Sequence, residues 1–135
     1  MSVTVPLART AATPAERCPT SVWLAAGATT LLAVVQSYGA YYFSFVFEQP
    51  QVRASSVVFV ALVWALNATA LAAAVGLVRG RRLARRIALG YVGWHVAFTA
   101  AKLVFWHETE AVGFGVVSLG LLALLCAPAS RRYAR

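Results

Sequence analysis

The sequence predicts an all-α integral membrane protein, with four transmembrane helices in an antiparallel up-and-down bundle and both termini in the cytoplasm. Two observations lead to this prediction. The 135 residues are 61% hydrophobic and only 12% charged, and the apolar residues gather in long uncharged runs, whereas a soluble domain carries about 25% charged residues. The arginines are also divided unequally among the connections that four such helices would leave.

The uncharged runs have the length of membrane-spanning helices. A helix needs about 20 predominantly apolar residues to cross the hydrocarbon core of a bilayer. Four segments meet this requirement, and we expect helices at about residues 22–45, 56–78, 87–106 and 111–127. Only Lys102 interrupts the third segment, close to its end.

The regions outside the helices are short and polar. Residues 1–20, which contain proline and threonine, are expected to form a disordered cytoplasmic tail. Residues 21–130 form one transmembrane domain, Pro128 is expected to end the last helix, and residues 131–135 form a basic cytoplasmic tail.

The arginines predict the orientation. Ten of the eleven precede the first helix, connect the second and third helices, or follow the fourth, whereas the other two connections hold Arg53 and three of the four acids. Basic residues favour the cytoplasmic side, so we expect a multi-pass protein of the bacterial plasma (inner) membrane. Its expected partners are the lipid bilayer and, at the cytoplasmic face, anionic lipid head groups. The membrane topology already accounts for the distribution of the arginines, so no nucleic-acid partner is expected.

Three polar side chains fall at similar depth in three different helices. Gln36, Asn67 and His95 all lie near the middle of their segments. An unsatisfied polar group in hydrocarbon costs several kcal/mol, so we expect these side chains to face and hydrogen-bond one another. Two interpretations remain open: hydrogen bonds that only join helices, and a functional pocket for a ligand or a proton.

The third helix extends this polar interior. His95, Thr99, Lys102 and Trp106 are spaced so that they share one helix face, and Tyr91 continues it one turn away. Lys102 has two interpretations. Its ammonium group either reaches the membrane interface along its flexible stem or pairs with an anionic ligand or an acid. The acids in question are Glu48, Glu108 and Glu110.

Aromatic and acidic residues gather at the ends of the helices away from the arginines. This candidate outer rim comprises Tyr41, Tyr42, Glu48, Trp106, His107, Glu108 and Glu110. Aromatic residues concentrate at membrane interfaces because their rings are amphipathic. The rim is therefore interpreted as an aromatic belt, with a binding vestibule as the alternative.

The sequence offers no pattern for a metal, a cofactor or a catalytic constellation, and we expect none. His95 and His107 are about 18 Å apart along a helix, and Cys18 and Cys126 form no CxxC pair. Small four-helix multidrug exporters are similar in length, but they use a membrane-buried glutamate in the first helix, where this chain has only Gln36.

These observations predict a non-enzymatic membrane subunit or accessory protein that packs against a membrane-protein partner or forms a homo-oligomer. The alternative is a small transporter or ligand-binding membrane protein that uses a polar interior around Gln36, Asn67, His95 and Lys102. An enzyme acting on lipids or quinones is a third, weaker possibility.

Overall fold

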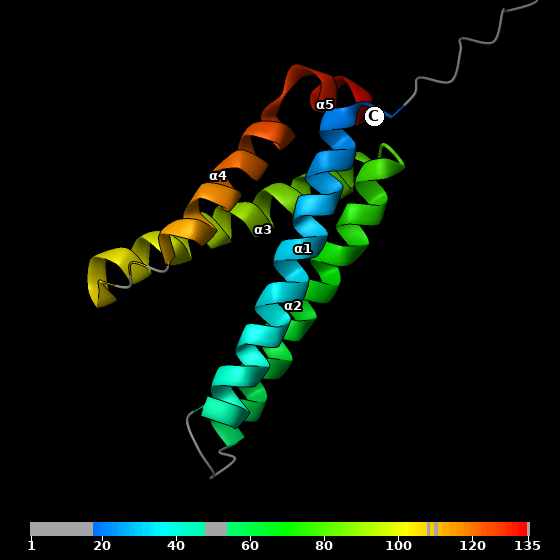
Figure 1. Cartoon of the computed structure of the whole chain (residues 1–135). Coiled ribbons are helices and arrows are strands. Elements are labelled where there is room, and N and C mark those ends of the chain that lie inside the picture. The colour runs from blue at the N-terminus through cyan, green and yellow to red at the C-terminus, as the bar shows by residue number, and fades with distance from the viewer. Residues whose placement is uncertain (1–17, 48–53, 108, 110, 135) are drawn as a thin grey trace, which may run out of the picture.

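The computed structural model describes residues 18–47, 54–107, 109 and 111–134, and this part of the chain is helical without any strand (Figure 1). The helices are α1 (Thr20–Tyr42), α2 (Ala54–Val78), α3 (Arg82–Ala101), α4 (Ala111–Cys126) and α5 (Pro128–Tyr133). Short π-helical turns continue two of them, η1 (Phe43–Phe47) after α1 and η2 (Lys102–Trp106) after α3. The all-α prediction is confirmed for the described residues.

Three helical stretches are long and apolar enough to cross a membrane. They are Thr20–Val46, Ser56–Val78 and Arg82–Phe105. The fourth candidate, Ala111–Cys126, is apolar but has only 16 residues, so it spans about 24 Å against a hydrocarbon core of about 30 Å. The described residues therefore contain three to four helices compatible with membrane crossing.

The helices form two hairpins, α1–α2 and α3–α4, which meet at one end of the molecule and diverge toward the other (Figure 1). The fully buried residues of α1 all lie between Val22 and Ala33, in the half where the hairpins meet. Small side chains fill much of this core, among them Ala25, Ala73 and Ala88. Small residues let helix backbones approach closely where lipid provides no hydrophobic drive for association.

A tight turn joins α2 to α3 and fixes the junction of the two hairpins. Gly80 has φ 70°, its N–H donates to the Leu77 carbonyl, and the N–H of Arg81 donates to the Gly76 carbonyl. This is the glycine-dependent pattern that closes many helix C-termini. A Cβ atom on Gly76 would lie 2.5 Å from the Cβ of Ala84, so the turn requires glycine there for close packing.

One predicted helix boundary differs from the structure by several residues, and one short helix was not predicted. Helix α3 begins at Arg82 rather than at residue 87, because arginine favours helices intrinsically even though it interrupts an apolar run. The fourth helix ends at Cys126, just before Pro128, as predicted. Pro128 also begins the unpredicted helix α5, where it stands in the first turn and its missing N–H costs no hydrogen bond. The predicted basic tail is thus partly helical, while residues 1–17 of the predicted N-terminal tail lie outside the described residues.

Candidate functional site

Asn67 stands at the centre of a chain of hydrogen bonds that joins three helices. It is 2% exposed. Its Nδ2 donates to the Ser37 Oγ of α1 over 2.9 Å, and its Oδ1 accepts from the Tyr91 hydroxyl of α3 over 2.9 Å. The Ser37 hydroxyl in turn donates to the Ala33 carbonyl over 2.8 Å. Proton donation thus runs in one direction from α3 through α2 to α1.

Gln36 and Trp64 complete this polar layer. The Oε1 of Gln36 lies 3.3 Å from the Tyr91 hydroxyl, which makes it a second and weaker acceptor for the single phenolic proton. The indole N–H of Trp64 donates to the Ser37 carbonyl over 3.2 Å. The layer therefore joins α1, α2 and α3, and most of its donors and acceptors already have partners.

His95 does not make the hydrogen bonds predicted for it. It is buried, but Tyr91 rather than His95 bonds Gln36 and Asn67. The two rings pack edge to face with centroids 4.5 Å apart and planes at 70°. That prediction was wrong because the phenol hydroxyl extends farther from the helix axis than an imidazole nitrogen and so reaches α1 and α2. The Nε2 of His95 has no hydrogen-bond partner among the described residues.

A second buried polar atom, on α4, is also without a partner. The Ser118 Oγ is fully buried and unbonded within the described residues. Helices α3 and α4 approach closely at Thr99, whose Cγ2 lies 3.1 Å from the position of a Cβ on Gly115. His95 and Ser118 lie about one turn from this contact on two antiparallel helices, both toward the hairpin junction, so they share one depth.

Lys102 lies at the start of η2, half-buried, with its Nζ 5.6 Å from the centroid of the Phe98 ring. This distance is within the range of a cation–π interaction. Of the predicted alternatives, pairing with an acid stays a prediction, because Glu48, Glu108 and Glu110 lie outside the described residues. Lys102 therefore follows α3, beyond Thr99, and none of the hydrogen bonds described for the polar layer includes it.

The outer rim is partly described. Tyr42 stacks on Tyr38 with ring centroids 6.0 Å apart, and Tyr41 contacts the Phe45 ring at 5.6 Å. His107 is exposed and ends η2 with φ 53°. The Trp106 side chain and the acids Glu48, Glu108 and Glu110 are outside the described part. Both rim segments contain π-helical turns, which frequently occur at functional sites.

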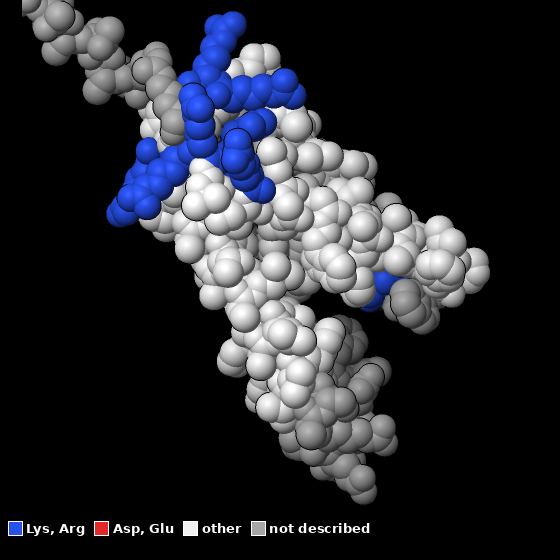
Figure 2. All heavy atoms as spheres, turned by 180° about the vertical axis from the view of Figure 1, so that it is seen from behind, with Lys and Arg blue, Asp and Glu red and all other residues white. Residues whose placement is uncertain are grey.

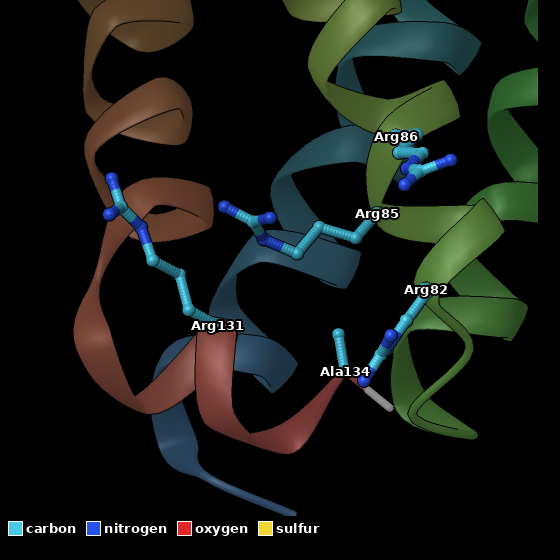
Figure 3. A pocket seen from close by; sticks show the side chains of 5 residues that line it. All are labelled: Arg82, Arg85, Arg86, Arg131 and Ala134. Carbon is cyan, nitrogen blue, oxygen red and sulfur yellow. The ribbon is translucent and has the colours of Figure 1, made fainter.

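The opposite end of the molecule carries the described arginines (Figure 2). We call it the basic end; its residues are Arg79, Arg81, Arg82, Arg85, Arg86, Arg131 and Arg132. A hollow of about 240 Å³ opens here, lined by Arg82, Arg85, Arg86, Arg131 and Ala134 (Figure 3). The sequence did not predict this hollow, because it depends on the unpredicted helix α5, which contributes Arg131 to its lining.

Hydrogen bonds hold α5 in place at this end. The Tyr133 hydroxyl donates to the Val78 carbonyl over 2.7 Å, and the Ser130 hydroxyl donates to the Leu124 carbonyl over 2.8 Å. A hydrogen bond with the Cys18 side chain, and then burial, raise the pKa of Tyr133 above its ordinary value. The phenol therefore stays protonated and remains a donor at neutral pH.

Two apolar hollows lie along α1. One, of about 350 Å³, opens between the middle of α1 and the first half of α4, and its lining residues are Leu31, Leu32, Val35, Gly113, Phe114 and Val117. We call it the interhairpin opening. The other, of about 510 Å³, runs between α1 and α2 beside Trp23 and Val75. Within the described ranges, no three His, Cys, Asp or Glu side chains are grouped for a metal ion.

Comparison of the chain with protein-family models, curated proteins and solved structures finds no match. Any functional assignment therefore depends on the geometry of the chain itself.

Proposed function

We propose that the chain is a multi-pass protein of a bacterial plasma membrane, and that it acts without catalysis as a subunit that packs against a transmembrane helix of another membrane protein. The basic end would face the cytoplasm, since arginines concentrate on that side of membrane proteins. The N-terminus of α1, the α2–α3 turn and α5 all lie at this end, which supports an orientation with both termini inside.

The interhairpin opening is the observation that supports packing against a partner. Its walls are almost entirely apolar, so in a bilayer either lipid chains or an apolar helix would fill it. Gly113 favours a partner helix over lipid chains as the occupant of the opening. A Cβ at this position would meet nothing within 4 Å in this chain, yet glycine inside a helix costs about 1 kcal/mol relative to alanine. A partner backbone that approaches closely would account for the glycine.

The partner can be tested by site-specific photo-crosslinking in intact cells. Phe114, which lines the opening, is replaced by benzoylphenylalanine and the crosslinked products are resolved by mass. We expect one discrete product with a second membrane protein. Val117→Trp, which fills the opening, should reduce this product roughly tenfold, because overpacking costs about 1–3 kcal/mol and 1.4 kcal/mol corresponds to a factor of ten.

A neighbouring valine provides the matched control. Val116 is on the same helix and 65% exposed, but it does not line the opening. Val116→Trp should leave the product unchanged. Crosslinks to lipid alone, or an equal loss in both tryptophan variants, would contradict the proposal. A product with twice the mass of the chain would replace the foreign partner with a homo-oligomer.

A second candidate function uses the interior of the α3–α4 hairpin. His95 Nε2 and Ser118 Oγ are both buried and without partners in the described structure, and such groups are rare unless water, an ion or a ligand satisfies them. Their shared depth would suit a small hydrogen-bonding ligand or a transferred proton. The His95 variants considered in the Discussion distinguish this function from a purely structural role.

A further inference from the structure

We infer that the hollow at the basic end is a binding site for the phosphate group of an anionic phospholipid, with its acyl chains beside α3. The inference rests on the membrane placement proposed above. It does not depend on a partner helix at the interhairpin opening, which lies on other residues.

The hollow is assembled from two elements that are distant in sequence. Arg82, Arg85 and Arg86 come from the first turns of α3, whereas Arg131 comes from α5 (Figure 3). The hydrogen bonds of Ser130 and Tyr133 fix α5 at this place. Basic residues that determine membrane orientation need only lie on the cytoplasmic side. Orientation alone therefore does not explain why four of the five residues that line one hollow are arginines.

Arg85 is held in a defined position within this site. Its Nε donates to the Leu125 carbonyl over 3.0 Å, near the C-terminus of α4, where a cation is favoured by the helix dipole. A guanidinium group has five N–H donors in a planar fork. The terminal nitrogens of Arg85 therefore remain as donors for a ligand while the bond to α4 limits their movement.

The positive charges around the hollow favour the binding of an anion. Four guanidinium groups repel one another at short range, and none of the acids of the chain belongs to the described residues at this end. The N-terminal end of α3, which adds positive dipole character, has no acid in its first turn and no side-chain cap. Arginine recognises phosphate through paired hydrogen bonds, so a phosphate group suits both the charge and the donors.

Exposed apolar residues on the same turns of α3 favour a lipid over a soluble phosphate. Leu83 and Ile87 are 67% and 38% exposed, and each directly follows a lining arginine, Arg82 and Arg86 respectively. A phospholipid offers a phosphate next to acyl chains, which matches this neighbouring pair of surfaces. Basic pockets among transmembrane helices on the cytoplasmic side are a known form of lipid head-group site.

The test uses the purified full-length chain in mild detergent, with bound lipid counted by native mass spectrometry during a titration. The probes are phosphatidylglycerol, phosphatidylcholine, and glycerol 3-phosphate as the soluble phosphate. The site variant replaces Arg82, Arg86 and Arg131 with glutamine and spares the bond of Arg85 to α4. The control variant replaces Arg79, Arg81 and Arg132, which are exposed at the same end but do not line the hollow.

Both variants lose three positive charges. A difference between them therefore distinguishes binding in the hollow from general electrostatic attraction to the basic end. We expect phosphatidylglycerol to bind the site variant on the order of 100-fold more weakly than the unmodified chain, and the control variant about threefold more weakly or less. Equal losses, or binding of phosphatidylcholine as tight as that of phosphatidylglycerol, would overturn the site. Glycerol 3-phosphate binding as well as the lipid would overturn the lipid as its occupant. Melting curves of all three proteins verify that the variants are folded.

Discussion

Asn67→Leu is expected to lower the free energy of unfolding by about 2 kcal/mol, the largest loss that we predict for a single polar residue. The change removes both hydrogen bonds that join α2 to Ser37 and Tyr91. Interhelical hydrogen bonds in membrane proteins contribute about 0.6 kcal/mol on average and up to about 1.7 kcal/mol. Titration of the purified protein with a denaturing detergent measures the loss, and Ala68→Leu, at the next and exposed position of α2, is the control expected to change little.

A double-mutant cycle tests whether the layer acts as a unit. Tyr91→Phe alone removes the donor to Asn67 Oδ1 and should also destabilise the protein. Because Asn67 and Tyr91 share a bond, the double variant should lose less than the sum of the two single losses, by more than about 0.5 kcal/mol. Additive losses would show that the hydrogen-bonded layer does not couple α2 to α3.

His95→Phe is expected to raise the free energy of unfolding by about 1 kcal/mol. The substitution keeps an aromatic ring against Tyr91 and removes a buried nitrogen that has no partner in the described structure. Leaving such a group unsatisfied costs about 1–3 kcal/mol. His95→Gln, which keeps polar atoms but loses the ring, should be less stable than the native chain in the same denaturing titration.

The same pair of variants separates a structural histidine from a functional one. A more stable His95→Phe protein that still forms the Phe114 crosslink would support a role in packing alone. A less stable one would mean that Nε2 has a bound partner, such as water, an ion or a ligand, and would favour the second candidate function. Ser118→Ala should then show the same loss.

The fold class was predictable because a bilayer imposes a strong and simple constraint on sequence. Uncharged runs near 20 residues mark α1, α2 and much of α3 directly. The same rule misplaced the start of α3, since the rule detects apolar residues whereas the helix extends through Arg82, Arg85 and Arg86. It also missed α5, which is too short and too basic to resemble a membrane segment.

The depth of the polar residues along the helices was predictable, whereas their hydrogen-bond partners were not. Counting residues placed Gln36, Asn67 and His95 at one level, and the structure joins the first two through Tyr91. Depth depends only on the rise of a helix, whereas partners depend on helix rotation and side-chain length. Ser37, which accepts a hydrogen bond from Asn67, is also polar and directly follows Gln36 in the sequence. Residue spacing alone does not show which of two consecutive side chains on α1 faces α2.

The orientation of the chain is the central claim, and thiol labelling in intact cells tests it most directly. Cys18 and Cys126 are first replaced with alanine, and a single cysteine is introduced by Arg132→Cys at the basic end or by Thr109→Cys at the opposite end, both exposed positions. The account predicts that a membrane-impermeant maleimide labels the Thr109→Cys protein in intact cells and the Arg132→Cys protein only after the membrane is opened. Labelling of Arg132→Cys in intact cells, with protection of Thr109→Cys, would contradict it.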